Sequence, residues 1–501
     1  MNKGIRMSVQ SYLHLGSVHT VEAFQRHLRE HQIVIPCDAE LASGGDSPLA
    51  RPLTINNLRV GNRFAIHPME GWDGTLDGRP TDLTTRRWRN FGRSGAKLIW
   101  GGEAVAVLHD GRANPNQLLI NEQTRADLSR LRDALIEEHR NACGSADDLA
   151  IGLQLTHSGR YSQPNVKGRP EPRILYHHPL LDRRVGLNAD YPLLSDGEVR
   201  GIIEAFHRSA RIAQEIGFDF VDVKHCHGYL GHEFLSAHTR EGDYGGGFVN
   251  RTRFLSEIVE GIRATAPGLE IGVRLSAFDT VPFRPDPDRS APGKPGPGIP
   301  EPYSELLPYR WGFGVNVNDP AEIELNEAVQ FLSLLRELGV RLVNITAGSP
   351  YYNPHIQRPT LFPPSDGYLP PEDPLVGVAR QLSAARALKL QFPDIMIVGT
   401  AYTYLQDFLP NVAQGAVRDG WVDTVGLGRM VLAYPELPLQ VLEGRKLDRK
   451  RLCRTFSDCT TAPRNGLPSG CYPLDTHYKK SEMATQLSEI KNRHRKESAK
   501  A

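Results

Sequence analysis

The feature that most constrains the fold of this chain is a regular alternation of short apolar runs with longer amphipathic stretches, which begins near Arg51. Runs of four to eight β-branched or apolar residues between helical patterns are typical of βα units with a parallel sheet. Eight such runs are expected to form strands, at residues 63–67, 97–100, 150–155, 218–223, 270–275, 341–345, 395–399 and 422–426. Eight strand-then-helix units predict an α/β fold, a closed (β/α)8 TIM barrel.

The stretches between these strands carry the period of amphipathic helices. The clearest runs over residues 195–216, where Ser195 and Glu198 have the spacing of a capping box. Another helix is predicted over residues 322–338 from apolar residues at three- and four-residue steps. A doubly wound open sheet is the alternative to the barrel, but no GxGxxG turn follows an early strand, as a Rossmann fold would require.

The barrel is predicted over residues 51–440, with additions at both ends. Residues 1–50 form an N-terminal extension outside the core fold, and residues 441–501 a C-terminal extension whose basic end, KNRHRKESAK, is expected to be frayed. Residues 283–310 are rich in Pro and Gly and follow the fifth strand. We expect them to form an irregular rim loop on the face where barrel enzymes keep their active sites.

Composition argues against several classes of partner. A formal net charge of +1 gives no excess of positive charge for nucleic acid or a membrane surface. No apolar run approaches the roughly 20 residues of a membrane span, and the amino terminus lacks a signal-peptide pattern. Six cysteines without a CxxC pair do not make a disulfide framework. We expect a cytoplasmic protein with a small-molecule substrate; whether it is a homo-oligomer stays open.

Glycine-containing turns follow the seventh and eighth predicted strands. Gly399 and Thr400 end one strand, and Gly428 and Arg429 follow the other. Glycines there let backbone N–H groups approach an anion, the following helix start adds a favourable dipole, and an arginine adds a charged contact. These turns predict a phosphate site, a position that recurs in barrel enzymes. The alternative, that tight turns need glycine for steric reasons alone, is equally compatible with the sequence.

Polar side chains end the third, fourth and fifth strands. Gln154 lies in QLTHSGR, and Arg274 in GVRLS. An arginine near the end of an inward-facing strand is costly unless it has a negative or strongly polar partner. The densest group is KHCHGYL, which brings Lys224, His227 and Tyr229 within six residues. A lone histidine is more often structural, but this concentration of proton donors favours catalysis.

The motif HGYL…EFLS…DYGG…NR.RF resembles the segment after the fourth barrel strand in the Old Yellow Enzyme superfamily. NRFAIHPM at 62–69, QLTHSGR at 154–160, GVRLS at 272–276 and VGLGR at 425–429 match other landmarks of that family, in the same order. The resemblance covers roughly residues 52–438. It implies a noncovalent FMN at the top of the barrel, reduced by NADH or NADPH and reoxidised by an organic acceptor.

The resemblance also implies a role for each matching residue. Pro68 and Met69 would line the flavin with backbone groups, and Gln154 would offer its amide to the pyrimidine edge. Arg274 would lie beside N1 and the C2 carbonyl and stabilise the anionic reduced flavin. The phosphate would be held by Gly399, Thr400, Gly428 and Arg429.

Tyr229 matches the proton donor of the family. In an ene-reduction, flavin N5 passes hydride to the β-carbon of an activated alkene while the tyrosine protonates the α-carbon on the opposite face. The resemblance therefore implies an FMN-dependent NAD(P)H oxidoreductase that reduces an enone, enoate or dienoate. One alternative is a flavin-dependent dehydrogenase or N-demethylase of a small amine. Another is a non-catalytic barrel that binds flavin or phosphate.

Two residues depart from the family pattern near the reacting atoms. Lys224 stands where a neutral His usually grips the substrate carbonyl, so Lys224 and His227 are expected to bind an anionic or strongly polarised oxygen. Alternatively, Lys224 pairs with a carboxylate and His225 takes over its role. Glu70 stands near the expected flavin C4 carbonyl, where it disfavours anionic reduced flavin unless protonated or paired. Alternatively, Glu70 turns away to an arginine.

The third departure concerns cysteines. The dienoyl-CoA reductase and trimethylamine dehydrogenase branch of the family carries four cysteines for a [4Fe–4S] cluster in this part of the chain. Cys459 and Cys471 keep the last spacing, but Cys453 is displaced and Phe456 offers no thiolate. Four thiolates are the norm for such a cluster. We therefore expect no [4Fe–4S] cluster and no other metal.

Overall fold

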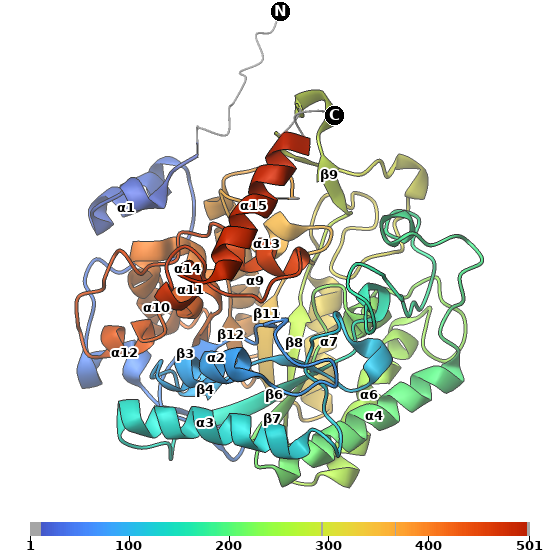
Figure 1. The fold of residues 1–501 in the computed structure, drawn as a ribbon, viewed down its shortest axis with the longest axis horizontal. Coiled ribbons are helices and arrows are strands. Elements are labelled where there is room, and N and C mark those ends of the chain that lie inside the picture. The colour runs from blue at the N-terminus through green and yellow to red at the C-terminus, as the bar shows by residue number, and fades with distance from the viewer. Residues whose placement is uncertain (1–11, 292–293, 366, 498–501) are drawn as a thin grey trace, which may run out of the picture.

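The eight predicted strands form a closed parallel barrel. The computed structural model describes residues 12–291, 294–365 and 367–497. Within them, neighbouring strands pair in parallel, and β13 and β4 both pair with β3, which closes the barrel (Figure 1). Its strands are β3 (Phe64–Ile66), β4 (Leu98–Ile99) continued by β5 (Ala104–Ala106), β6 (Ala150–Thr156), β7 (Phe220–Val223), β8 (Glu270–Ser276), β11 (Leu342–Thr346), β12 (Met396–Gly399) and β13 (Thr424–Leu427). The predicted fold class and all eight strand positions are confirmed.

Helices surround the barrel. The longer ones are α2 (Asp82–Gly92), α3 (Arg125–Cys143), α4 (Asp196–Glu215), α6 (Phe248–Thr265), α7 (Asn326–Glu337), α9 (Pro374–Gln391) and α10 (Leu409–Arg418). The predicted capping box opens α4: the amide of Glu198 donates to Ser195 Oγ, and the amide of Ser195 donates to the Glu198 carboxylate. Helix α7 starts four residues later than predicted, because Ile323 forms an isolated β-bridge with Val315.

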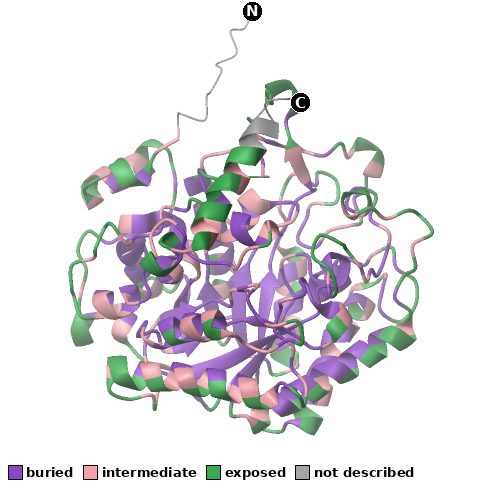
Figure 2. Ribbon diagram, viewed as in Figure 1, coloured by how far each residue is buried: buried purple, intermediate pink, exposed green. Residues whose placement is uncertain are grey.

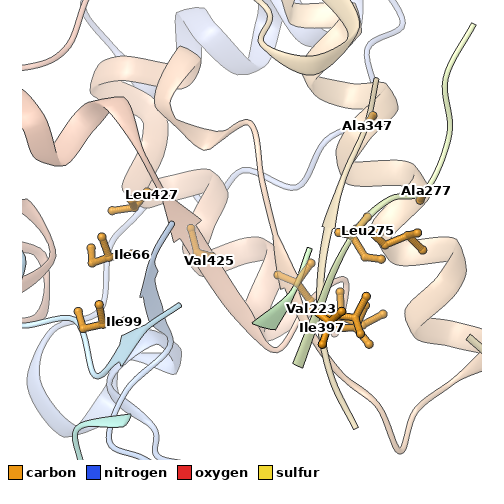
Figure 3. Packing of buried hydrophobic residues seen from close by; sticks show 14 of the residues in the cluster. Ile66, Ile99, Val223, Leu275, Ala277, Ala347, Ile397, Val425 and Leu427 are labelled. Atoms are coloured by element: carbon orange, nitrogen blue, oxygen red, sulfur yellow. The ribbon is translucent and has the colours of Figure 1, made fainter. Parts of the chain in front are cut away.

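Successive side chains along each barrel strand point alternately toward the surrounding helices and into the barrel. Figure 3 shows side chains of the outer layer, among them Ile66, Val223, Leu275, Ile397 and Leu427, in the cluster that the strands share with the helices. Figure 2 shows this centre as continuously buried. Because side chains alternate with a period of two, the residues between them point into the barrel. That register turns Gln154, Asp222 and Arg274 toward the barrel axis.

A two-stranded hairpin closes the amino-terminal end of the barrel. Strands β1 (Leu53–Ile55) and β2 (Leu58–Val60) pair in antiparallel register. Their apolar side chains pack on residues at the start of the barrel strands, including Leu98, Phe220 and Met396. The open end is therefore the carboxyl end of the strands, where barrel enzymes bind their substrates.

The N-terminal extension packs against the side of the barrel, next to α10. Its helix α1 (Val21–Glu30) places Phe24 in a stack on Phe408, with ring centroids 4.3 Å apart. Further along, the carboxylate of Asp38 accepts a hydrogen bond from Gln414 at 2.6 Å. Residues 1–11 of the predicted extension lie outside the described residues.

The C-terminal extension crosses the open end of the barrel and then forms helices. These are α13 (Asp458–Arg464), α14 (Thr476–Lys479) and α15 (Glu482–Glu497), which runs across the upper part of Figure 1 in red. The basic end that is predicted to be frayed is described as helix as far as Glu497. Leu487 anchors α15, since it is buried with Ala462, Tyr472 and Tyr478 in a small apolar cluster. Residues 498–501 lie outside the described part.

The Pro- and Gly-rich stretch at 283–310 follows β8, as predicted, and its described residues contain no α-helix. A short antiparallel pair was not predicted: β9 (Phe283–Pro285) lies beside β10 (Gly298–Pro300). Residues 292–293 of the predicted loop are outside the described ranges. Across all described residues, none of the helices combines the length and the apolarity needed to cross a membrane.

Candidate active site

A pocket of about 290 Å³ lies at the carboxyl ends of the barrel strands. Most of the residues singled out in the sequence line it together: Pro68, Met69, Glu70, Gln154, Lys224, His227, Tyr229, Arg274, Thr400, Gly428 and Arg429. Gly399 is not among the lining residues. A Cβ there would meet Val422 at 2.8 Å and the Tyr402 hydroxyl at 3.1 Å, so this glycine meets a steric need within the fold.

The buried carboxylate of Asp222, which was not predicted from the sequence, orients residues at the bottom of the pocket. Asp222 accepts hydrogen bonds from Gln154 Nε2 at 2.6 Å, from the amide of Arg274 at 2.7 Å and from Trp100 Nε1 at 2.8 Å. Burial raises the pKa of Asp222 to about 6. Because the amide nitrogen of Gln154 is committed to Asp222, its carbonyl oxygen is the atom left for a ligand. Asp222 could have been recognised from the sequence, because it is an acidic residue at an inward-facing position of β7.

Two buried guanidinium groups make the pocket suited to an anionic cofactor. Within the described residues, Nε of Arg274 and Nη1 of Arg429 are buried without a hydrogen-bond partner. Leaving a buried charged donor unpaired is costly, so both positions call for acceptors from a ligand. Gly428 adds an open backbone: a Cβ there would meet only Met69 Sδ, at 3.6 Å. These residues fit a flavin with a phosphate tail.

Other predicted flavin contacts are already engaged within the protein. The amide of Met69 donates to the carbonyl of Gly102 at 3.1 Å. A ligand can therefore be contacted only by the side chain or the carbonyl of Met69. The Thr400 hydroxyl donates to Gln381 Oε1 at 2.8 Å, so towards a ligand this hydroxyl can only accept a hydrogen bond. At Gly426, a Cβ would lie 2.1 Å from the ring of His67, so only glycine leaves room for that ring.

Lys224, Glu70 and Tyr229 form one cluster in the pocket. Lys224 Nζ lies 3.5 Å from Glu70 Oε1 and 3.7 Å from the centre of the Tyr229 ring. The Tyr229 hydroxyl donates to Glu70 at 3.1 Å and lies 3.0 Å from the hydroxyl of Tyr351. The alternative in which Lys224 pairs with a carboxylate is therefore what the structure shows, and the partner of Glu70 is this lysine rather than an arginine. Tyr351, on the segment after β11, was not anticipated.

His227 faces the pocket, whereas His225 does not. His227 Nε2 lies 3.3 Å from Thr346 Oγ1 and 3.5 Å from Gln357 Nε2. His225 bonds through Nδ1 to the Val223 carbonyl at 3.0 Å, and its ring packs against Phe254 and Phe331 beneath the helices. The hypothesis that His225 replaces the missing histidine is wrong, because its side chain points outward from the barrel.

The titration of His227 and Tyr229 leads to a pH prediction. Burial, reinforced by the charges of Arg274 and Lys224, holds the pKa of His227 well below its usual value. Burial and the Glu70 carboxylate hold the pKa of Tyr229 well above its usual value. His227 is then neutral and Tyr229 protonated from about pH 6 to 9. We expect the single-turnover rate of flavin reoxidation by an alkene to be flat over that range. An inflection near pH 6.5 that disappears in His227→Gln would contradict this assignment.

The C-terminal extension supplies part of the pocket wall, which the sequence analysis missed. Cys459, Thr460, Pro463, Arg464 and Ser469 all line it. The amide of Ser469 donates to the carbonyl of Gly71 at 2.6 Å and so ties the extension to the loop after β3. Among the described residues, no group of three or more His, Cys, Asp or Glu is arranged to hold a metal ion.

Comparisons with known proteins agree with this geometry. Residues 48–286 match the model of the NADH:flavin oxidoreductase / NADH oxidase family. An NADPH dehydrogenase of Geobacillus sp. (strain WCH70) is 31% identical over 247 residues, which are 47% of this chain and 65% of that protein. An NADPH dehydrogenase of Geobacillus thermodenitrificans (strain NG80-2) is 30% identical, over 64% of its length. The chain thus spans slightly less than two thirds of these curated relatives.

Two solved structures share the fold. A 2-naphthoyl-CoA reductase bound to 2-naphthoyl-CoA gives a TM-score of 0.62 at 19% identity, over 86% of this chain and 57% of that one. A morphinone reductase bound to tetrahydroNAD gives 0.51 at 21% identity, over 80% of this chain and 92% of that one. These two likenesses show the barrel fold. The family model that matches residues 48–286 and the NADPH dehydrogenase relatives support the resemblance to the Old Yellow Enzyme / NADH:flavin oxidoreductase superfamily that the motifs predicted.

Proposed function

We propose that this chain is an FMN-dependent NAD(P)H oxidoreductase that reduces an activated C=C bond. The observation that carries the proposal is a buried tyrosine hydroxyl, that of Tyr229, in the same pocket as the unpaired guanidinium nitrogens of Arg274 and Arg429. A bound FMN supplies the transfer of a hydride. The NADPH dehydrogenase relatives make NADPH the first reductant to test.

The residues of the chain then have distinct tasks. Arg429 and the backbone of Gly428 would hold the phosphate of the cofactor, and Arg274 would supply a fixed positive charge that favours its reduced, anionic form. Gln154, oriented by Asp222, accepts a hydrogen bond through its amide oxygen. Tyr229 delivers a proton from its hydroxyl to the substrate carbon. Glu70 and Tyr351, both in hydrogen-bond contact with that hydroxyl, are positioned to return the proton.

Lys224 and the neutral His227 are proposed to hold the oxygen that activates the alkene. Because Lys224 carries a charge and is almost fully buried, it favours an anionic oxygen such as a carboxylate or enolate over a neutral ketone. Without substrate, Lys224 pairs with Glu70, and the carboxylate of a substrate would compete with Glu70 for Lys224. An amine substrate would be cationic and is disfavoured by the same lysine.

Replacing Lys224 with alanine is expected to lower kcat/KM for an enoate by about 10- to 100-fold, the worth of one charge-assisted hydrogen bond. A neutral enone should lose much less, and this difference between two substrates of one enzyme is the measurement. The matched control is Lys450→Ala, an exposed lysine on the C-terminal segment. Equal losses for enoate and enone would show that Lys224 does not read the charge of the substrate.

The proposed function is tested by the absorbance of the purified protein and by anaerobic titration. We expect flavin absorbance, bleached by NADPH or NADH and restored by an alkene acceptor. Bleaching by an amine but not by NAD(P)H would assign the amine dehydrogenase alternative. A folded protein that is colourless and does not take up added FMN would overturn the proposal.

A further inference from the structure

The loop after β3, which carries Glu70 into the active-site pocket, is held by a buried charge cluster of three residues. Arg87, on α2, donates from Nη1 to Asp73 at 2.5 Å and from Nη2 to Glu103 at 2.6 Å. The three side chains are at most 4% exposed. None of them is among the residues that line the pocket. Any influence of the cluster on the site must therefore pass through the loop that it holds.

A single peptide group links the buried charge cluster to Glu70. The amide of Gly71, which belongs to the peptide bond between Glu70 and Gly71, donates to Glu103 Oε1 at 2.6 Å. The other carboxylate oxygen of Glu103 is the one that accepts from Arg87. Because a peptide group is planar, fixing the direction of its N–H also fixes the backbone torsion that aims the Glu70 side chain. Glu103 is therefore in a position to set where the Glu70 carboxylate lies.

The following residues of the loop are fixed as well. The amide of Ser469 donates to the carbonyl of Gly71 at 2.6 Å, which holds the next peptide group. A Cβ on Gly71 would lie 2.1 Å from the Arg87 guanidinium, so only glycine leaves room for this arginine. Trp72 has a φ of +53°, a value that bulky residues rarely adopt. Such strain persists only where the surroundings impose it, and here the cluster binds the residues on both sides of Trp72, Gly71 and Asp73.

Glu103 is not needed to neutralise Arg87. Asp73 already contacts both terminal nitrogens of the guanidinium, at 2.5 and 3.0 Å. A second carboxylate leaves the cluster with an excess of negative charge, which is costly in a buried place. Burial accordingly raises the pKa of Glu103 to about 7, although Arg87 opposes the rise. What Glu103 adds to the pair of Arg87 and Asp73 is its bond to the amide of Gly71.

We propose that Glu103 is a positioning residue that holds the Glu70 carboxylate on Lys224. This inference rests on the proposed function and adds to it the residues that set how available its lysine is to a substrate. Glu70 lies 3.5 Å from Lys224 Nζ and 3.1 Å from the Tyr229 hydroxyl, so a small rotation of the peptide group after Glu70 breaks these contacts. Lys224 would then bind the carboxylate of a substrate without competition from Glu70.

The variant Glu103→Gln tests the inference. Its side chain keeps the shape of glutamate but has one acceptor oxygen, which the guanidinium of Arg87 attracts, so that an NH2 group faces the amide of Gly71. Calorimetry with butyrate, a carboxylate without an alkene, measures the availability of Lys224 in the flavin-loaded protein and involves no turnover. We expect the variant to bind butyrate about 3- to 10-fold more tightly than the wild type, because Glu70 competes less for the lysine. General loosening of the pocket would weaken this binding instead.

A double-mutant cycle shows whether Glu103 acts through Glu70. In the Glu70→Gln background the competing carboxylate is already gone, so Glu103→Gln should not change the affinity for butyrate any further. The matched control is Glu327→Gln on α7, which removes a carboxylate from another buried arginine, Arg251, and should leave butyrate binding unchanged. The inference is overturned if Glu103→Gln binds butyrate no more tightly than the wild type, or if its gain persists in the Glu70→Gln background.

A second variant, Arg87→Lys, repeats the test should Glu103→Gln lose its fold. A lysine keeps the positive charge but does not bond two carboxylates through a planar fork, so Glu103 loses its anchor and butyrate should again bind more tightly. Glu70→Gln by itself separates the two proposals. If it binds butyrate more tightly while the Glu103 and Arg87 variants do not, only the positioning role is lost. If neither it nor the wild type binds butyrate, the proposed role of Lys224 is lost and this inference with it.

Discussion

Tyr229→Phe is expected to slow the reoxidation of reduced flavin by an alkene by about 10²- to 10⁴-fold, the usual contribution of a positioned general acid. The substitution removes one oxygen atom and leaves the ring beneath Lys224, so the shape of the pocket is kept. Reduction of the flavin by NADPH involves no proton from this hydroxyl and should keep its rate. Stopped-flow measurement of the two half-reactions separates these effects.

Two comparisons make this prediction specific. Tyr191→Phe removes a hydroxyl that donates to a backbone carbonyl far from the pocket and should leave both half-reactions unchanged. Tyr351→Phe removes the neighbouring hydroxyl and should slow reoxidation less than Tyr229→Phe, since Glu70 still contacts Tyr229. Wild-type reoxidation in Tyr229→Phe would remove this residue from the role of proton donor.

Arg429→Ala is expected to weaken FMN binding by about 10- to 100-fold, which corresponds to one lost charge-assisted contact with phosphate. The flavin-free protein should not lose stability to the same degree, because Arg429 is there a buried cation with an unpaired Nη1. The substitution is therefore expected to reduce the stability that bound FMN adds more than it reduces the stability of the flavin-free protein. The measurement is therefore the shift in Tm on addition of FMN, which should shrink in the variant.

Arg418→Ala, on the exposed end of α10, is the matched control for that shift. Riboflavin, which lacks the phosphate, provides a second one: its binding should be similar in the wild type and in Arg429→Ala. If both flavins lost affinity equally, Arg429 would be acting on the fold of the turn after β13 and not on the phosphate.

The barrel could be predicted from the sequence because its pattern is local. Each strand is a short apolar run. The apolar periodicity of α4 and its capping box both depend only on residues close together in the sequence. The start of α7 could not be predicted, since it depends on a bridge between Val315 and Ile323 that competes with the helix. The order of α15 could not either, because it depends on burial of Leu487 against side chains from other segments.

The candidate site follows the same division. Residues at strand ends, such as Gln154, Arg274 and Tyr229, could be identified because parallel strands bring their carboxyl ends to one place. The partners of Glu70 and Lys224 could not, because the two residues are far apart in the chain and either could have paired elsewhere. Trp72 was missed because its conformation is imposed by the buried charges around Arg87, which no local pattern reveals.

The crossing of the barrel mouth by residues 459–469 has a consequence for biogenesis. The barrel strands are complete once β13 has been synthesised, but the wall that Thr460 and Pro463 contribute must wait for later residues to leave the ribosome. A nascent barrel would hold a shallower, more open mouth from which a cofactor escapes easily. Loading of the cofactor is therefore expected to follow release of this segment, and the extension would act as the latch that retains it.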